Sequence, residues 1–453
     1  MNLPEQFKTQ MRQLLGSEYE AYEKSFEQPR VCGLRVNTMK ISVEEFQRRA
    51  PFLLEPVPWA EDGFYYDPSH EVTRHPYYYA GLYYIQEPSA MIPASRLPVS
   101  PGERVLDLCA APGGKATRLG AKLEGQGLLV ANDVSNSRAK GLLKNLEQFG
   151  IGNVLVTSES PRRLAEVFPA YFDKILVDAP CSGEGMFRRD PAMVKNWQEQ
   201  GPEYYSRLQK EILQEAVKML KPGGMMLYST CTFAREENED NVRFLLERNP
   251  GMRTVPMQGA NGFQEDTDLH TLRLFPHRVR GEGHFAALLQ WGDNHAGDTM
   301  EKRRRQHKPG KIVLPEVLLD FLHGLREFDW ETGRIYIRER RAYLLPKEVE
   351  SLENLRFLRT GLYLGEVKKN RFEPSQALAM NLRLNQAPSF LTLSSEDPRV
   401  IRYLKGETLE LSHQEAAGLT EWVLFGTDGY PLGWGKLVNG TLRNKYYPGW
   451  RIQ

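Results

Sequence analysis

Residues 105–115 read Val-Leu-Asp-Leu-Cys-Ala-Ala-Pro-Gly-Gly-Lys, and this stretch decides how the middle of the chain folds. The apolar run predicts a buried strand, and the glycine pair predicts a tight turn into a helix. Backbone N–H groups at such a turn can approach a ligand closely. The stretch has neither the GxGxxG fingerprint of a dinucleotide site nor the GK[ST] ending of a P-loop. A purely structural turn explains the glycine pair about equally well.

Outward from this stretch, apolar runs alternate with amphipathic windows over residues 101–292. The alternation predicts a doubly wound parallel sheet, and so an α/β domain of Rossmann-like type. Buried strands are expected at residues 105–108, 128–131, 153–157, 174–177 and 225–228. One helix should begin after Ser135 and end at Gly150, because serine is a good N-cap and glycine a good C-cap.

The second expected strand ends at Asn132-Asp133, about 20 residues beyond the glycine pair. In folds of this kind an acidic side chain at that place accepts hydrogen bonds from the hydroxyls of a ribose. The glycine turn lacks a phosphate-binding pattern, so a cofactor with a ribose but no pyrophosphate fits best. S-adenosyl-L-methionine is such a molecule.

Two cysteines follow the fourth and fifth expected strands, Cys181 within Asp178-Ala179-Pro180-Cys181 and Cys231 within Ser229-Thr230-Cys231-Thr232. Ligands of open parallel sheets bind at the carboxyl ends of the strands, so both thiols should converge beside the glycine turn. A thiolate that adds to carbon 6 of cytosine makes carbon 5 nucleophilic. That reaction also needs a group that stabilises charge at N3 and a base for the C5 proton. Asp178 and the second cysteine are candidates for these roles.

Length and composition exclude several classes of protein. The chain has 453 residues, of which 41% are hydrophobic and 26% charged, as in a globular protein of roughly three domains. No apolar run approaches the roughly 18 residues of a membrane span, and the N-terminal residues lack a signal-peptide pattern. The four cysteines show no CxxC spacing, and Cys32 and Cys109 are most simply small buried side chains. We expect a cytoplasmic monomer without a metal site.

Changes in pattern divide the chain into four parts. Residues 1–100 predict a small α+β domain of RRM-like type, and residues 101–292 are the Rossmann-like domain. Residues 293–311 are expected to form a basic linker, because residues 301–311 hold six Lys or Arg and one acid. Residues 312–453 are rich in strand and turn signals, with a hairpin expected over Val423–Lys436.

The motifs quoted above resemble those of the NOL1/NOP2/Sun family of RNA cytosine-5 methyltransferases, most closely its bacterial ribosomal-RNA branch of the RsmF type. Further similar segments are Gln86–Ala90, Glu184–Arg189, Arg273–His277, Gly281–Phe285 and Phe425–Arg451, the last in a PUA-like RNA-binding module. The resemblance implies methylation of carbon 5 of a specific cytosine in ribosomal RNA, 16S rRNA in particular. It also implies S-adenosyl-L-methionine as methyl donor and a covalent bond between a cysteine and carbon 6.

The resemblance implies roles for individual residues. Cys231 looks like the nucleophile, Cys181 like the residue that assists release, and Asp178 like the acid on the side of the base. Lys115 looks like the residue that orients the cofactor carboxylate and the target base. The implied cofactor-binding residues are Cys109, Ala110, Ala111, Pro112, Gly113, Gly114, Lys115, Asp133, Arg138, Ser160 and Asp178.

Ser160 departs from the family pattern. Relatives commonly have an aspartate near the adenine of the cofactor where this sequence has Ser158-Glu159-Ser160. Ser160 can still bond the adenine amine, although without charge. Glu159 is the alternative for this contact.

A net charge of +1 means that any surface for nucleic acid must be local. Lys436–Arg451 holds four Lys or Arg and no acid, interleaved with Tyr446, Tyr447 and Trp450. Aromatic side chains in such a segment can stack on bases or close a small β-barrel core, and Trp450 suits both roles.

We expect ribosomal RNA or the small ribosomal subunit as the partner, with no obligate protein partner and no membrane. The alternative function is that of a catalytically silent RNA-binding factor in ribosome assembly, against which the intact cysteine pair argues. Methylation of an adenine amino group would instead need an Asn/Asp-Pro-Pro-aromatic motif, and residues 178–181 carry a thiol there.

Overall fold

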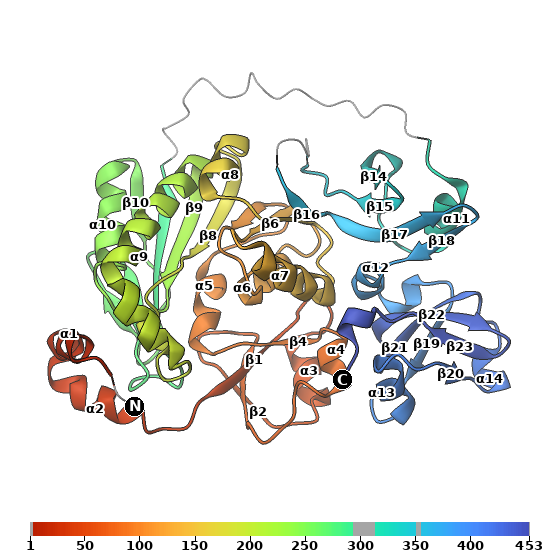
Figure 1. Ribbon diagram of the computed structural model, residues 1–453, viewed down its shortest axis with the longest axis horizontal. Coiled ribbons are helices and arrows are strands. Elements are labelled where there is room, and N and C mark those ends of the chain that lie inside the picture. The colour runs from red at the N-terminus through yellow and green to blue at the C-terminus, as the bar shows by residue number, and fades with distance from the viewer. Residues whose placement is uncertain (1–2, 293–312, 350–354, 453) are drawn as a thin grey trace.

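The computed structural model describes residues 3–292, 313–349 and 355–452 (Figure 1). Within these ranges the chain forms four β-sheets, and the largest lies in the middle of the molecule. The linker expected at residues 293–311 lies outside the described residues. Among the helices in these ranges, none combines the length and the apolar character that crossing a membrane requires.

The central sheet has the strand order β11-β12-β13-β9-β8-β5-β6-β7-β16, with β10 paired to β13. Its five parallel strands are β5 (Arg104–Asp107), β6 (Leu128–Asn132), β7 (Val154–Thr157), β8 (Phe172–Asp178) and β9 (Leu220–Thr230). The antiparallel strands beyond β9 are β10 (Met252–Val255), β11 (Gln264–Asp266), β12 (Thr271–Leu274) and β13 (His284–Trp291). All five predicted strands are present and pair in parallel.

Helices cover both faces of this sheet. On one face α6 (Gly114–Lys122) and α7 (Asn136–Phe149) share a core with Leu129 of β6. On the other face α8 (Pro161–Val167), α9 (Ala192–Met219) and α10 (Glu239–Arg248) share a core with Val130. Successive strand residues therefore face opposite helical layers, as the two-residue period of a strand requires. The Rossmann-like α/β fold predicted from the sequence is confirmed.

The N-terminal residues form two helices followed by a second, smaller sheet. The helices α1 (Glu5–Leu15) and α2 (Tyr19–Ser25) pack on Phe187, Phe233 and Phe275. The sheet is antiparallel, with the order β2-β3-β1-β4. Its elements are β1 (Cys32–Val36), α3 (Val43–Arg49), β2 (Leu54–Pro56), β3 (Gly63–Tyr66), α4 (Pro76–Tyr79) and β4 (Tyr83–Ile85), and α5 (Ile92–Arg96) follows. The connectivity is that of a β-α-β-β-α-β unit.

The C-terminal residues form two further sheets. The first has the order β14-β15-β17-β18 and the second β19-β21-β22-β23-β20. Elements of the first part are α11 (Glu316–Gly324), β14 (Ile335–Arg338), β15 (Arg341–Leu344), β17 (Leu362–Lys368), β18 (Arg371–Pro374) and α12 (Gln376–Asn381). Elements of the second are β19 (Phe390–Leu393), α13 (Pro398–Leu404), β20 (Leu409–Glu410), α14 (His413–Ala416), β21 (Trp422–Thr427), β22 (Tyr430–Val438) and β23 (Thr441–Asn444). The pairing of β21 with β22 confirms the predicted hairpin.

One strand from the C-terminal residues joins the central sheet. Strand β16 (Phe357–Thr360) pairs antiparallel with β7, so that Phe357 lies opposite Thr157. The sequence did not predict this pairing, because nothing in residues 357–360 identifies a partner 200 residues away. The pairing brings the residues just before β16 to the end of β7, next to Glu159.

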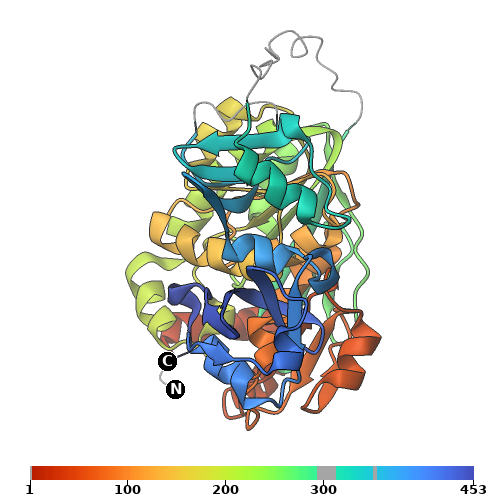
Figure 2. The same ribbon diagram turned by 90° about the vertical axis from the view of Figure 1, so that its right-hand side faces the viewer.

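The N-terminal sheet and the last sheet also pack against each other (Figure 2). Leu34 and Tyr83 share one buried core with Tyr403, Phe425 and Trp450. The C-terminal residues thus contact both of the preceding parts of the chain.

Candidate active site

The glycine turn is held by the strands on either side of it. The N–H of Leu108 donates to the carbonyl of Leu176, and the N–H of Ala110 donates to the carbonyl of Asn132. Gly113 then starts α6 at a φ of 116°, and a side chain there would crowd Leu142. A glycine is needed for both reasons. The turn thus opens toward the carboxyl ends of β5 and β6.

Asp133 lies at the end of β6, where the sequence predicts a ribose contact. It is almost fully buried, and its Oδ1 accepts a hydrogen bond of 2.9 Å from the N–H of Ser135. Arg138 Nη2 lies 3.4 Å from Asp133 Oδ2 and donates to the carbonyl of Ala111 at 2.8 Å. Arg138 therefore bridges Asp133 and the glycine turn. The predicted ribose contact and the predicted cofactor turn are thus next to each other.

The two candidates for an adenine contact are in different situations. Ser160 is exposed and caps α8, since its Oγ accepts from the N–H of Arg163 at 3.3 Å. Glu159 is buried, and its Oε1 accepts from the N–H of Arg356 at 2.8 Å. The carboxyl group of Glu159 is therefore engaged by the residue that precedes β16, and Ser160 keeps the freer side chain.

Lys115 and Asp178 form an ion pair between the turn and the end of β8. Lys115 Nζ lies 2.7 Å from Asp178 Oδ2, and Ser229 Oγ donates to Asp178 Oδ1 at 2.8 Å. Burial raises the pKa of Asp178, but the charge of Lys115 and the hydrogen bonds from Lys115 and Ser229 outweigh it and lower the pKa below its ordinary value. Burial likewise works against the charge on Lys115, and the Asp178 carboxylate raises the pKa of Lys115 overall. Both groups are therefore charged at neutral pH.

The two thiols meet, as the sequence predicts. Cys181 Sγ lies 3.3 Å from Cys231 Sγ and 3.4 Å from the N–H of Cys231. The hydrogen bond from Cys231 and burial together raise the pKa of Cys181 well above its ordinary value. Cys231 is the more accessible of the two. One accessible and one buried thiol thus share the mouth of the site.

Asp107 gives an independent test of whether this site suits S-adenosyl-L-methionine. It ends β5 directly before the glycine turn, is fully buried, and has no hydrogen-bond partner for either oxygen among the described residues. Burial and the nearby Asp178 raise its pKa to about 8. A buried carboxyl group without a partner suits a cationic ligand, and the cofactor carries a sulfonium and an ammonium group. The residues of the site fit this cofactor.

Two buried residues near the thiols were not predicted as site residues. His284 lies with Nε2 3.8 Å from Asp178 Oδ1, and burial lowers its pKa to about 3, which keeps it neutral. Glu237 contacts the residue that follows Cys181. His284 belongs to the quoted segment Gly281–Phe285, which could have drawn attention to it, whereas Glu237 stands in an acidic run without any distinguishing signal.

The other two cysteines are apart from the thiol pair. Cys109 lies in the glycine turn, where burial raises the pKa of its thiol. Cys32 lies on β1, in the N-terminal sheet. Both are partly exposed, not buried as predicted, because Cys109 lies in the turn after β5 and Cys32 is the first residue of β1. Among the described residues no three His, Cys, Asp or Glu side chains are grouped as a metal site would require.

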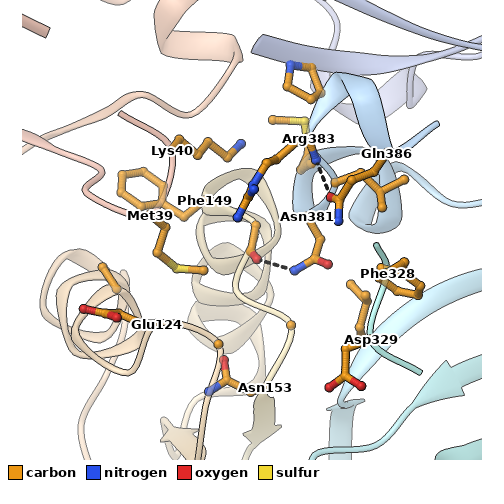
Figure 3. Close-up of a pocket in the computed structure, with 18 of the residues that line it drawn as sticks. Met39, Lys40, Glu124, Phe149, Asn153, Phe328, Asp329, Asn381, Arg383 and Gln386 are labelled. Carbon is orange, nitrogen blue, oxygen red and sulfur yellow. Dashed lines mark hydrogen bonds between the residues drawn. The ribbon is translucent and has the colours of Figure 1, made fainter. Parts of the chain in front are cut away.

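A large groove lies elsewhere, at the opposite ends of the parallel strands. Its volume is about 1180 Å³, and its walls include residues 99–101, before β5, and Phe149, Gly150, Gly152 and Asn153, before β7. Figure 3 shows Met39 and Lys40 on one side and Phe328 and Asp329 on the other. None of the candidate site residues lines it. The chemistry is therefore expected at the carboxyl ends of the strands and not in this groove.

Four family descriptions match successive parts of the chain. The N-terminal domain of 16S rRNA methyltransferase RsmF matches residues 3–88, and 16S rRNA methyltransferase RsmB/F matches residues 94–290. The RsmF rRNA methyltransferase first C-terminal domain matches residues 320–382, and the methyltransferase RsmF PUA domain matches residues 390–452.

Similar proteins cover nearly the whole chain. The ribosomal RNA small subunit methyltransferase F of Enterobacter sp. (strain 638) is 33% identical over 98% of this chain and 95% of its own length. The protein of that name from Escherichia coli O7:K1 (strain IAI39 / ExPEC) is 31% identical with the same coverage.

Solved structures from Pyrococcus horikoshii are also similar. A methyltransferase homolog protein is 32% identical, with a TM-score of 0.56 over 64% of this chain and 95% of its own. NSun6 shares the fold at 22% identity, with a TM-score of 0.57 over 64% of this chain and 98% of its own.

Proposed function

Because this chain belongs to the family of 16S rRNA methyltransferases RsmB/F, within the NOL1/NOP2/Sun family, we propose that it methylates carbon 5 of one cytosine in 16S rRNA. The family uses S-adenosyl-L-methionine, which supplies an electrophilic methyl group. Carbon 5 of cytosine is too weak a nucleophile to take that group unaided. The observation that supports this chemistry is the pair of thiols 3.3 Å apart beside the Lys115–Asp178 ion pair.

The first step is addition of the Cys231 thiolate to carbon 6 of the base. This addition moves the electrons of the C5–C6 double bond toward carbon 5 and N3, and the Lys115–Asp178 pair stabilises the negative charge at N3. Carbon 5 then takes the methyl group, whose former bonding electrons stay with the sulfur of the donor. The Lys115 ammonium, 2.7 Å from Asp178 Oδ2, can give a proton to N3 and take it back when the C5–C6 double bond re-forms. Cys231 is the nucleophile in this proposal because it is the more accessible thiol.

Release is an elimination. A base takes the remaining proton from carbon 5, its electron pair restores the C5–C6 double bond, and the C6–S bond breaks to return a thiolate to Cys231. Cys181 accepts this proton as a thiolate, which forms when the Cys181 thiol gives its own proton to water. Its place supports the role, because Cys181 Sγ lies 3.3 Å from Cys231 Sγ.

Asp133 and Arg138 would hold the ribose end of the cofactor, and the glycine turn with Asp107 would hold its charged end. Ser160, at the end of β7, remains our candidate for the adenine amine. The target cytosine must be unpaired or turned out of a helix, because a duplex hides its C5–C6 bond.

The substrate is ribosomal RNA, and the family description of residues 390–452 as a PUA domain supports RNA contact there. We propose that one copy of the chain acts alone on 16S rRNA or the small subunit in the cytoplasm. We also propose the division into residues 1–100, 101–292, 293–311 and 312–453 as functional parts.

The thiols are tested by trapping the covalent intermediate. Cys181→Ala, incubated with S-adenosyl-L-methionine and 16S rRNA or small subunits from a strain without the enzyme, is expected to yield a protein–RNA adduct on a denaturing gel. Addition by Cys231 still proceeds in this variant, whereas release does not. Cys231→Ala and the double variant are expected to form neither adduct nor 5-methylcytosine.

Cys32→Ala is the matched control and should methylate like the parent, because this thiol lies on the N-terminal sheet. Formation of 5-methylcytosine by Cys231→Ala would contradict the covalent route. If the parent transfers no methyl group to either substrate, the silent assembly factor becomes the better explanation.

A further inference from the structure

We propose that Glu237 and Gln209 hold the loop of Cys181 in the position from which this thiol releases the methylated base. Both are positioning residues, since neither is expected to touch the reacting atoms. The inference rests on the covalent mechanism proposed above and assigns its release step to two residues outside the quoted motifs.

Glu237 and Gln209 bind the backbone of the residues immediately before and after Cys181. Glu237 Oε2 accepts a hydrogen bond of 3.0 Å from the N–H of Ser182, the residue after Cys181. Gln209 Nε2 donates to the carbonyl of Pro180, the residue before it, at 2.9 Å. The same Nε2 donates to Glu237 Oε2 at 2.8 Å, which joins the two contacts. The two peptide groups next to the cysteine are thereby fixed.

This hydrogen-bonded set, which we call the release clamp, is anchored in the core. Gln209, on α9, has no exposed surface, and its Oε1 accepts from Asn241 Nδ2 at 2.8 Å and from the hydroxyl of Tyr228 at 3.1 Å. Glu237 has no exposed surface either. Because buried hydrogen bonds of this kind are costly to leave unmade, the clamp leaves the loop little freedom.

The clamp also ties Cys181 to Cys231. Ser182 Oγ lies 2.7 Å from Thr232 Oγ1, so the residues that follow the two cysteines are bonded to each other. Gly185 donates its N–H to the carbonyl of Cys231 at 2.9 Å. The relative position of the two sulfur atoms therefore depends on this loop, whereas the glycine turn and Asp133 of the cofactor site follow β5 and β6 and are not bonded to it.

One oxygen of Glu237 makes both of its contacts in the clamp. Oε2 accepts both hydrogen bonds, while Oε1 has no partner among the described residues. Burial also raises the pKa of Glu237 to about 7, so its charge is not constant near neutral pH. A glutamine can supply one oxygen in the same place, and it then presents its amide nitrogen where Oε1 lies. We therefore expect that Glu237 positions the loop through its hydrogen-bond acceptor Oε2, and that its negative charge is not required.

The test compares Glu237→Ala with Glu237→Gln in the adduct assay, using S-adenosyl-L-methionine and 16S rRNA or small subunits. Glu237→Ala is expected to accumulate the protein–RNA adduct as Cys181→Ala does, with release slowed about fivefold to 150-fold, the effect of leaving the buried N–H of Ser182 without its acceptor. Glu237→Gln is expected to turn over like the parent. Glu236→Ala is the matched control, because Glu236 is exposed and contacts Ser206 through its backbone carbonyl, which the substitution keeps.

A purely structural defect would lower adduct formation and product together, so adduct accumulation distinguishes positioning from misfolding. Calorimetric binding of S-adenosyl-L-methionine verifies that each variant retains its cofactor site. If Glu237→Ala does not bind the cofactor, Gln209→Met replaces it. That variant removes the contact with Pro180, leaves the bond between Glu237 and Ser182, and is expected to accumulate adduct as well.

The outcomes separate this inference from the proposed function. Adduct in both Glu237→Ala and Glu237→Gln would overturn positioning in favour of a role for the charge or the proton. Adduct in Cys181→Ala but in no clamp variant would overturn the inference alone. Absence of adduct from Cys181→Ala itself would refute the covalent mechanism, and the inference with it.

Discussion

The protonation of Asp107 makes the free energy of unfolding depend on pH. The pKa of this buried group is raised from 3.8 to about 8 by burial and by the charge of Asp178. Between about pH 4 and pH 8 the folded chain therefore holds a proton that the unfolded chain has released. The contribution of Asp107 to the free energy of unfolding consequently falls as the pH rises through this window. A cationic ligand favours the ionised form and offsets this cost.

Binding of S-adenosyl-L-methionine at pH 7 is accordingly expected to release up to about one proton, as its positive charge lowers the pKa of Asp107. Calorimetry in buffers with different heats of ionisation measures this release. Asp107→Asn should bind with a smaller release, and its melting temperature should fall less between pH 5 and pH 8 than that of the parent. Asp173→Asn, at the far end of β8, is the control. An equal release by parent and Asp107→Asn would refute the assignment.

Helix α7 links the Rossmann-like domain with the C-terminal residues. It begins after Ser135, whose Oγ accepts from the N–H of Arg138, and it ends at Gly150 with a φ of 78°. The carbonyl of Gly150 accepts from Asn381 Nδ2 at 2.8 Å (Figure 3), and a side chain at residue 150 would lie 2.5 Å from the carbonyl of Met380. The helix end that the sequence predicted is thus also a contact with α12.

Gly150→Ala is therefore expected to destabilise the protein for two reasons. Alanine is strained in the left-handed backbone conformation of this residue, and its Cβ would clash with the carbonyl of Met380. Gly125 separates these effects, because it has a φ of 77° but no atom of another described residue within 4 Å of the position that a Cβ would take. We expect Gly125→Ala to cost about 1–2 kcal/mol and Gly150→Ala about 1–3 kcal/mol more. Urea denaturation of both variants measures the difference. Equal midpoints would mean that α12 moves aside at no cost.

In the whole molecule, the glycine turn is supported by parts of the chain distant in sequence. Arg35 of β1 is fully buried and donates to the carbonyl of Gly114 at 2.9 Å and to Thr117 Oγ1 at 2.7 Å. Burial lowers its pKa to about 10, which still leaves it charged at neutral pH. On the other side, Arg359 of β16 pairs with Glu147 of α7. The N-terminal sheet therefore supports the start of α6 at the cofactor site, whereas the C-terminal residues hold the last turn of α7, toward the opposite ends of the parallel strands.

The last sheet shows which aromatic residues remain available to RNA. Tyr446 and Trp450 are buried in the core shared with the N-terminal sheet, so Trp450 serves packing and not base contact. Tyr447 is 55% exposed. An exposed aromatic face beside basic side chains is suited to stacking on a base.

Tyr447→Ala is expected to weaken binding of 16S rRNA about fivefold to 150-fold, the loss of one stacked base, without lowering stability. Trp450→Ala is expected to cost about 3–5 kcal/mol of stability, because it opens a cavity in the shared core. Filter binding and urea denaturation measure the two effects. Tyr204→Ala, on α9, is a control for an exposed tyrosine. Unchanged RNA affinity in Tyr447→Ala would place the RNA contact elsewhere.

The five parallel strands of the Rossmann-like domain, the ends of α7 and the convergence of the two thiols could be predicted from the sequence alone, whereas the antiparallel strands β10 to β13 could not. Strand positions, the ends of α7 and the hairpin over residues 423–436 follow from local patterns of apolar residues, caps and turns. The meeting of Cys181 with Cys231 follows because parallel neighbours end at one edge of a sheet. These features depend on interactions between residues close in sequence, or on a rule that holds for every sheet of this type.

Which side chains are used in packing and which remain for chemistry depends on contacts between parts of the chain that are distant in sequence. Glu159 is taken up by the backbone of Arg356, Trp450 is buried, and the acid at residue 237 becomes part of the release clamp. Each outcome depends on a partner from another part of the chain, and local sequence carries no information about that partner. Burial and hydrogen bonding are properties of the assembled surroundings, so they could be read only after the fold had brought those surroundings together.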